Sequence, residues 1–240
     1  MGNVPKTLID LLWRGHPNAP DGGSRGPRAK RSTTAVVDGA IALADTEGLD
    51  ALTVRALAQS LGMSTMSVYT HVNSRDDLLV LMTDSAHATM SLPPYGGTEW
   101  RARVRAVADS NLALLTAHPW LLEVHDPRSA LGPGTIAKYD HELHAFDDTG
   151  INGVERDAAL TFVLDFVRAN ASARLVATGF DAVWSDATVK LGEYVGRDYP
   201  LARRVGAAAG ERMGGPYSPA AAWEFGLGRI IAGLAAIIDE

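Results

Sequence analysis

The chain contains no cysteine, which excludes a disulfide framework, thiolate metal ligands and a cysteine nucleophile. Long apolar runs are also scarce, because the longest clean run, at 230–238, is about half of what a membrane span requires. Asp10 interrupts an apolar patch at 8–13, and no signal sequence with a small-residue cleavage site is present there. These absences predict a soluble protein in the cytoplasm.

Motifs of catalysis are missing as well. The sequence has no G-x-S-x-G, no phosphate-binding P-loop and no G-x-G-x-x-G that opens a helix after a strand. His141 and His144 lie three positions apart and could share a metal ion, but without a third ligand the pattern favours an exposed polar helix face. We therefore predict no catalytic residue, no metal site, no cofactor and no enzymatic activity.

Charge is distributed unevenly along the chain. The net charge is −6, which argues against indiscriminate binding of nucleic acid by the whole molecule. Residues 1–37 nevertheless carry six Lys and Arg against two acids, whereas residues 91–240 carry fourteen against nineteen. A basic head on an acidic body indicates that one end meets a polyanion, and a solvated tail is the alternative for the first twenty or so residues.

Hydrophobic periodicity predicts an all-α fold, since few segments alternate at period two and β-branched clusters are sparse. Glycine and proline at 14–29 indicate that residues 1–29 form a flexible leader. Prolines and glycines at 93–97 mark a boundary between a domain at 30–90 and a second domain at 98–240. Helices are predicted at 33–47, 53–61, 64–71, 74–90, 99–117, 134–147, 154–178, 182–195, 200–212 and from 219 to the C-terminus.

The segment TVRALAQSLGMSTMSVYTH at 53–71 has the spacing of a helix-turn-helix, because Gly62 ends one helix and the next begins two residues later. We expect four apolar side chains to face the first predicted helix, and these are Leu57, Leu61, Val68 and Val72. Polar side chains then face outward on a helix of about two turns, which can donate to phosphates and base edges. These residues are Thr65, Met66, Ser67, Tyr69, Thr70 and His71.

Residues 33–80 closely resemble the DNA-binding domain of TetR-family transcriptional regulators. The resemblance is carried by ALADTEGLDALTVRALAQSLGMSTMSVYTHVNSRDDLL and especially by Y-x-H-V at 69–72, followed by Arg75. The segments at 98–120 and 223–237 more weakly resemble the C-terminal regulatory domain of a TetR-like branch found in actinobacteria. The family implies a three-helix DNA-binding domain with a connecting helix, an all-helical ligand-binding domain and a homodimer.

The resemblance also implies which side chains meet DNA. Arg55 matches a base-contacting arginine of the tetracycline repressor, and six more residues stand where that protein touches DNA. The six are Thr53, Thr65, Ser67, Tyr69, His71 and Arg75. Thr70 is a departure, because the tetracycline repressor has a tryptophan there.

The C-terminal half carries two helices that are apolar around much of their circumference, at 154–178 and 219–238. One chain has too small a core to cover both, so we expect a four-helix bundle between two copies, with a core wholly within one chain as the alternative. A symmetric dimer would place two recognition helices about 34 Å apart, one turn of the duplex.

Polar and aromatic residues within apolar segments are candidates for binding a small organic effector. These are Asn111, Trp120, His125, Phe162, Asp165, Phe166 and Asn170, each of which alone is more often a core or surface residue. The polar contacts of the tetracycline repressor do not line up at Val107 and Asn111, so a tetracycline is not predicted.

The predicted function is a ligand-responsive transcriptional regulator, a repressor that a small molecule releases from a palindromic operator. The sequence does not separate repression from activation. The alternative from another class is a helical enzyme or small-molecule carrier whose N-terminal helices bind a protein partner, for which no nucleophile–base pair is present.

Overall fold

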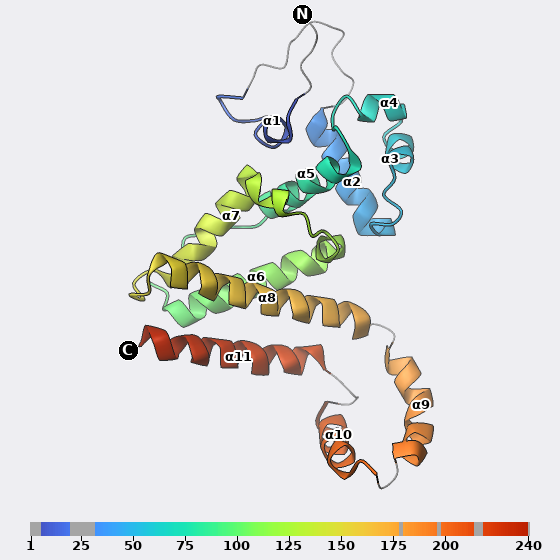
Figure 1. Ribbon diagram of the computed structural model, residues 1–240, viewed down its shortest axis with the longest axis vertical. Helices are drawn as coiled ribbons and strands as arrows, with labels where there is room; N and C mark the ends of the chain where they lie inside the picture. The colour runs from blue at the N-terminus through green and yellow to red at the C-terminus, as the bar shows by residue number, and fades with distance from the viewer. Residues whose placement is uncertain (1–5, 20–31, 178–179, 196–197, 214–217, 240) are drawn as a thin grey trace, which may run out of the picture. The chain divides into compact units, whose positions relative to one another are not determined.

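The structure is a computed structural model that describes residues 6–19, 32–177, 180–195, 198–213 and 218–239 (Figure 1). Within these ranges every regular element is helical, which confirms the predicted fold class. The chain divides into two compact units. Unit 1 comprises Met1–Thr98 and Asp109–Asp147, and unit 2 comprises Glu99–Ala108 and Asp148–Glu240. The units differ from the two predicted domains, because residues 109–147 pack with the N-terminal part of the chain.

The helices follow the predicted order with small changes at their ends. Unit 1 contains α1 (Leu8–Leu12), α2 (Thr33–Glu47), α3 (Val54–Ser60), α4 (Thr65–Val68), α5 (Arg75–Ala88) and α7 (Pro133–Leu143). It also contains the 3-10 helices η1 (Pro119–Leu122), η2 (Pro127–Leu131) and η3 (His144–Phe146). Unit 2 contains α8 (Gly153–Ala177), α9 (Phe180–Val195), α10 (Pro200–Met213) and α11 (Pro219–Ile238). Helix α6 (Trp100–Ala117) is continuous, and the division between the units falls within it.

In unit 1 the helices pack in a chain of neighbours, with α4 on α3, α3 on α2, α2 on α5 and α5 on α7. Figure 1 shows α3 and α4 at the opposite side of this unit from α7. Side-chain hydroxyls cap the helices that form the helix-turn-helix: Thr53 accepts from the N–H of Ala56, and Ser64 accepts from the N–H of Ser67. Such caps satisfy backbone donors that a helix end leaves without partners. The predicted helix starts therefore agree with the structure.

The turn between α3 and α4 depends on two glycines. Gly62 has φ of +63°, in the left-handed region where a side chain is disfavoured. Gly39 lies on α2 opposite this turn, and a Cβ added there would lie 2.7 Å from Cδ2 of Leu61. The absence of a side chain at position 39 thus lets α2 and the turn approach closely, which fixes the position of α4 on the core.

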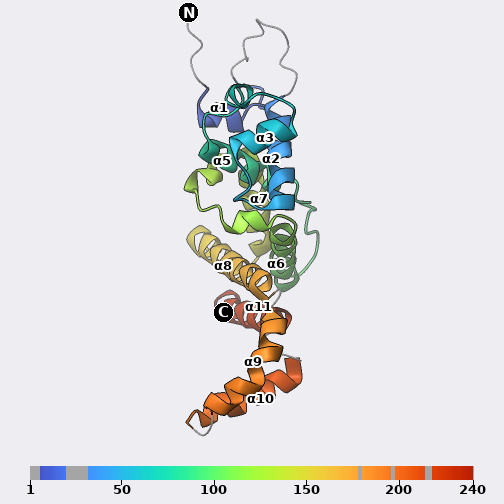
Figure 2. The same cartoon turned by 90° about the vertical axis from the view of Figure 1, so that its right-hand side faces the viewer.

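The N-terminal segment differs from the flexible leader that the sequence predicted for 1–29. Residues 8–12 form α1, which begins with reciprocal hydrogen bonds between Thr7 and Asp10 and buries Leu11 and Leu12 beside α5 (Figure 2). Asp10, which interrupts the apolar run in the sequence, is therefore part of a capping box. Residues 20–29 of the predicted leader lie outside the described residues.

In unit 2, α8 and α11 lie side by side (Figures 1 and 2). The ring of Phe166 stacks on Trp223 with centroids 5.4 Å apart. A Cβ at Gly226 would lie 2.4 Å from Cε2 of Phe166, so this glycine permits the close contact. Ser218 caps α11 and Pro219 occupies its first position, as predicted.

Candidate nucleic-acid interface and effector-binding residues

The short outward-facing segment at 65–70 is called the recognition segment. The four apolar residues that were expected to face the first helix behind it are buried. Leu57 and Val68 have no exposed surface, Val72 is 1% exposed and Leu61 is 8% exposed. They join a core formed with α2 and α5. Because four residues of α-helix have no stability of their own, this core holds α4 in place. The prediction that these side chains face inward is confirmed.

The outward face of the recognition segment is polar, with one large apolar side chain. Met66 is 73% exposed and Tyr69 is 49% exposed. Thr65 and Thr70 are exposed as well, while Ser67 is half-buried and its hydroxyl lies 2.8 Å from that of Ser64. These residues present hydroxyl groups and a thioether without any carboxylate, so the face does not repel phosphate.

Two predicted contacts on α3 are also accessible. Thr53 caps the helix with its hydroxyl and is exposed, and Arg55, two residues later, is exposed as well. Both lie on the element that precedes the recognition segment, so they extend its polar face.

His71 was predicted to face outward, and this prediction is wrong. Its side chain is 9% exposed, and Nδ1 lies 3.2 Å from the hydroxyl of Thr33 at the start of α2. Burial, followed by the charge of Lys6, lowers the pKa of this imidazole. The side chain of His71, which follows the exposed residues at 65–70, points back toward the core. His71 therefore joins the recognition segment to α2.

Arg75 is exposed but is engaged within the chain. Its Nε donates to the carbonyl of Leu52 and its Nη2 donates to the carbonyl of Leu49, both at 3.1 Å. The guanidinium thus ties the start of α5 to the loop that leads into α3. This geometry gives Arg75 a positioning role that the sequence did not indicate.

The seven predicted effector-binding residues are divided between the two units. In unit 1, Trp120 is 1% exposed and belongs to the core, with Nε1 donating to Asp45 of α2 at 2.8 Å. His125 is exposed. Asn111 is buried and donates to Glu142, whose other carboxylate oxygen accepts from Lys138 at 2.7 Å. The buried group formed by Asn111, Glu142 and Lys138 was not recognised as a unit from the sequence, although Lys138 and Glu142 stand one helical turn apart.

In unit 2, Phe162 is 55% exposed and Asp165 is exposed, so these two do not line an enclosed pocket within the unit. Phe166 packs on Trp223, and Asn170 is buried, donating to the carbonyl of Pro219 at 2.9 Å. Arg174 in turn donates to the side-chain oxygen of Asn170 at 2.8 Å. Phe166 and Asn170 therefore hold α8 to α11, as core residues do.

The histidines of the DHELH segment bind other groups. His141 lies 2.8 Å from the carbonyl of Pro93 and packs against Tyr95 with ring centroids 4.7 Å apart, while His144 lies 2.6 Å from Asp147. Within the described residues, no three His, Asp or Glu side chains gather in a way that could hold a metal ion.

Comparison with known proteins identifies the family. Residues 36–82 match the family model described as "Bacterial regulatory proteins, tetR family", and residues 92–238 match "Tetracyclin repressor-like, C-terminal domain". The chain belongs to the TetR family of bacterial regulators. This TetR-family membership confirms the predicted resemblance, and it assigns the chain to regulatory proteins rather than to enzymes.

Several relatives are similar to this TetR-family chain. The "HTH-type transcriptional repressor DrrR1" of Streptomyces coeruleorubidus is 35% identical over 178 residues, which are 72% of this chain and 63% of that repressor. An "HTH-type transcriptional regulator" of Saccharopolyspora erythraea is 30% identical over 141 residues, 59% of this chain and 60% of its own length. The chain thus spans about three fifths of the length of these two relatives.

Solved structures of ActR from Streptomyces coelicolor share the fold. The structure of ActR in complex with actinorhodin is 27% identical with a TM-score of 0.72 and covers 90% of this chain and 100% of that one. Apo ActR is 27% identical with a TM-score of 0.71 and covers 86% of this chain and 95% of that one. The TetR fold therefore extends over both parts of the chain.

Proposed function

We propose that this TetR-family chain is a DNA-binding transcriptional regulator, a repressor that leaves a palindromic operator when it binds a small organic molecule. The observation that carries the proposal is the exposed polar segment at 65–70, mounted on a buried apolar core within a helix-turn-helix. The similarity to DrrR1, which is named a repressor, favours repression over activation. A DNA partner agrees with a cytoplasmic location.

The proposed DNA-contacting residues are the exposed ones of α3, α4 and the following turn. They are Thr53, Arg55, Thr65, Met66, Tyr69 and Thr70, together with the half-buried Ser67. Their hydroxyl and guanidinium groups can donate to phosphates and base edges, and Met66 can contact the methyl group of thymine. His71 and Arg75 support this surface from behind, because their polar atoms bind other parts of the chain.

We propose a homodimer formed through α8 and α11. Helix α11 is long and apolar enough to cross a membrane by length and composition, and 22% of its most apolar window is buried in the structure. Its exposed face carries Phe225, 74% exposed, and Ile237, 52% exposed, while α8 exposes Phe162 and Val176. Apolar surface of this extent marks a protein or membrane contact, and TetR-family membership favours a second copy of the chain as the partner.

The apolar residues of α11 lie on two faces of the helix. Leu227, Ile230 and Leu234 are buried against the rest of unit 2, and Phe225 and Ile237 stay exposed for a partner. The helix thus has one face for its own chain and another that a four-helix bundle would cover.

A small organic effector is proposed from the family and from ActR, whose structure was solved in complex with actinorhodin. Of the seven predicted residues, we retain Phe166 and Asn170, which both lie in unit 2, as candidate effector contacts. Their polar atoms and ring are partly engaged within the chain, so an effector would have to exchange those contacts.

A mobility-shift assay on DNA from upstream of the gene tests the proposal. The double variant T65A/Y69A is expected to lose the specific complex, because it removes two exposed groups of the recognition segment. Tyr194→Ala, which removes a tyrosine that is 73% exposed on α9, is the matched control and should bind as the unsubstituted protein does. Specific binding that survives in the double variant would refute the assignment of this surface.

A further inference from the structure

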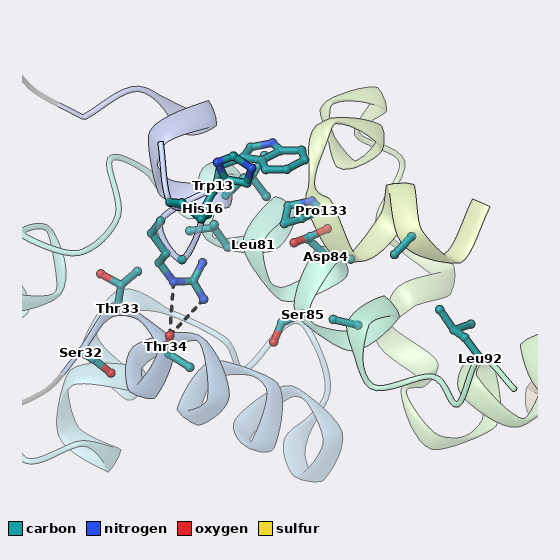
Figure 3. Close-up of a pocket in the computed structure, with 17 residues that line it drawn as sticks. Trp13, His16, Ser32, Thr33, Thr34, Leu81, Asp84, Ser85, Leu92 and Pro133 are labelled. Carbon is teal, nitrogen blue, oxygen red and sulfur yellow. Dashed lines mark hydrogen bonds between the residues drawn. The ribbon is translucent and has the colours of Figure 1, made fainter. Parts of the chain in front are cut away.

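Unit 1 contains a cavity of about 820 Å³ between the N-terminal segment and helices α2, α5 and α7 (Figure 3). This volume lies within the range of about 300–1,000 Å³ that small-molecule sites occupy. None of the seven effector-binding residues predicted from the sequence lines it. The cavity is therefore a separate feature, formed because α1 packs on α5 instead of leaving this side of the unit to solvent.

The N-terminal segment supplies an aromatic wall. Nε1 of Trp13 donates to the carbonyl of Leu131 at 2.9 Å, which fixes the position of the indole. The ring of His16 packs edge-on against it, with centroids 5.4 Å apart and an interplanar angle of 76°. Leu81 of α5 and Pro133 of α7 add apolar surface, as Figure 3 shows. A flat aromatic molecule fits a wall of this composition.

The opposite side of the cavity is lined by hydroxyl groups. Thr33 and Thr34 come from α2, and Ser85 comes from α5 (Figure 3). The Ser85 hydroxyl can donate to or accept from a hydroxyl or carbonyl of a ligand. The Thr34 hydroxyl, which accepts from Arg14, can still donate its proton. The cavity thus combines an apolar aromatic side with a neutral polar side.

Among the described residues that line the cavity there are one cation, Arg14, and one anion, Asp84, and both are engaged within the chain. The Arg14 guanidinium donates to the hydroxyl of Thr34 through Nε and Nη2, at 3.3 and 3.2 Å, and through Nη1 to the carbonyl of Leu11 at 2.9 Å. Asp84 is 6% exposed and accepts from the N–H of Thr135 at 2.8 Å, near the start of α7. Burial raises the pKa of this carboxyl, which disfavours its charged form. Both groups therefore already have hydrogen-bond partners within the chain, and neither is left over to pair with an ionised ligand.

We propose that this cavity binds a neutral, planar aromatic molecule that carries hydroxyl or carbonyl groups. The aromatic and apolar wall recognises the ring system, and the hydroxyls of α2 and α5 recognise its polar groups. An ionised compound is disfavoured because Arg14 and Asp84 are already engaged within the chain. The site does not depend on the proposed operator binding, since its walls all lie in unit 1 and its occupation is measurable without DNA.

Isothermal titration of the full chain with 2-naphthol, and with naphthalene-2-sulfonate as the anionic analogue, tests the site. We expect saturable binding of one 2-naphthol per chain and binding of the sulfonate that is weaker by about ten-fold or more, which corresponds to about 1.4 kcal/mol. Absence of saturable binding of 2-naphthol, or tighter binding of the sulfonate, would overturn the proposal.

Two cavity substitutions and one control locate the bound molecule. Ser85→Phe fills the cavity from α5 and should weaken 2-naphthol binding by about ten-fold or more. Ser110→Phe places the same side chain at an exposed position of α6 that does not line the cavity, and it should leave affinity unchanged. Trp13→Leu removes the aromatic wall and should also weaken binding, so it replaces Ser85→Phe if that variant does not fold. Equal affinity in the unsubstituted chain and in the folded cavity variants would refute the site.

The same preparations, assayed for an operator complex, separate this inference from the proposed function. Operator binding without 2-naphthol binding overturns only the cavity site. Binding of 2-naphthol that the cavity variants weaken supports the site even in a protein that forms no operator complex.

Discussion

Unit 1 and unit 2 differ in what they leave exposed. In unit 1 a buried apolar core supports the recognition segment from behind. The exposed face of this segment is polar and carries Thr65, Tyr69 and Thr70. Unit 2 exposes large apolar side chains on α8 and α11, among them Phe162 and Phe225. A polar face on a rigid support suits a hydrated polyanion, whereas an apolar face on long helices suits another apolar surface. The two units thus expose surfaces of opposite character.

The largest effect is expected from a charge placed on the exposed apolar face of α11 in unit 2. Phe225→Glu should convert the proposed dimer to monomers, because a carboxylate cannot be buried there without a partner. Operator affinity should then fall by about 100-fold or more, since two linked half-site contacts become one. Light scattering and fluorescence anisotropy measure the two effects.

Val189→Glu is the control for this prediction, because Val189 is 75% exposed on α9 and lies outside α8 and α11. It should leave the dimer intact. A Phe225→Glu protein that stays dimeric would show that the exposed face of α11 has another use.

The next effect tests how closely unit 1 is packed. A Cβ at Gly134 would lie 2.3 Å from the carbonyl oxygen of Asp84, so Gly134→Ala must displace α7 from α5. The free energy of unfolding should fall by about 1–3 kcal/mol or more. Gly153→Ala, where the added Cβ meets nothing within 4 Å, should change stability little. Urea titration of both variants measures the difference, and equal stability would contradict the close packing of α5 and α7.

A smaller effect distinguishes Tyr69, on the recognition segment, from His71, which follows it. His71→Ala should lower the free energy of unfolding by about 1 kcal/mol, because it removes the contact with Thr33 from a buried site. Tyr69→Ala should leave stability nearly unchanged while weakening operator binding, because the ring is 49% exposed. Thermal unfolding and anisotropy in parallel check both. Loss of stability in Tyr69→Ala alone would reverse the two roles.

The last effect, which is small near neutral pH, is a dependence of stability on pH within unit 1. Burial, followed by the charge of Lys138, lowers the pKa of His87 to about 3. The unfolded chain therefore binds a proton at His87 near its ordinary value of 6.5, and the folded chain does not. Stability from this group is present above pH 6.5 and is lost as pH falls from there toward the folded value.

His87→Asn retains a hydrogen-bonding group for Thr135 and removes the titration. The difference in unfolding free energy between the unsubstituted chain and this variant should thus shrink as pH falls below 6.5, up to a slope of about one proton. A difference that does not change with pH would mean that His87 titrates normally in the folded chain.

Much of the fold followed from local patterns. Helix periodicity and Gly62 as a stop predicted α2, α3 and α6 to within one residue at each end, because these signals act through neighbouring backbone groups. Helix α4 ends at Val68, three residues before its predicted end. The burial of Val68 and Val72 also followed, since a helix has one inner face. The candidate site was harder to predict from the sequence. The direction of the His71 side chain depends on its contact with Thr33, 38 residues away, which no local pattern contains.

The N-terminal segment shows the same limit. Its glycines and prolines indicate a leader, and the Thr7–Asp10 pair is the one local signal of a helix. What holds α1 is its contact with α5, together with the hydrogen bond from Trp13 to Leu131, a residue 118 positions away. Such contacts arise only once the chain is folded, so the cavity behind Trp13 could not be predicted.

The sequence by itself determined the α-helices from α2 onward and the helix-turn-helix, because capping, periodicity and turn chemistry are local, and its resemblance to TetR-family regulators implied the division of roles. The tertiary structure alone decided which polar groups stay available. It engaged His71 and Arg75 within the chain, buried Asn111 against Glu142 and formed an open cavity beside Trp13. The physical reason is that a buried polar group must find a hydrogen-bond partner, and the partners of these residues come from distant parts of the chain.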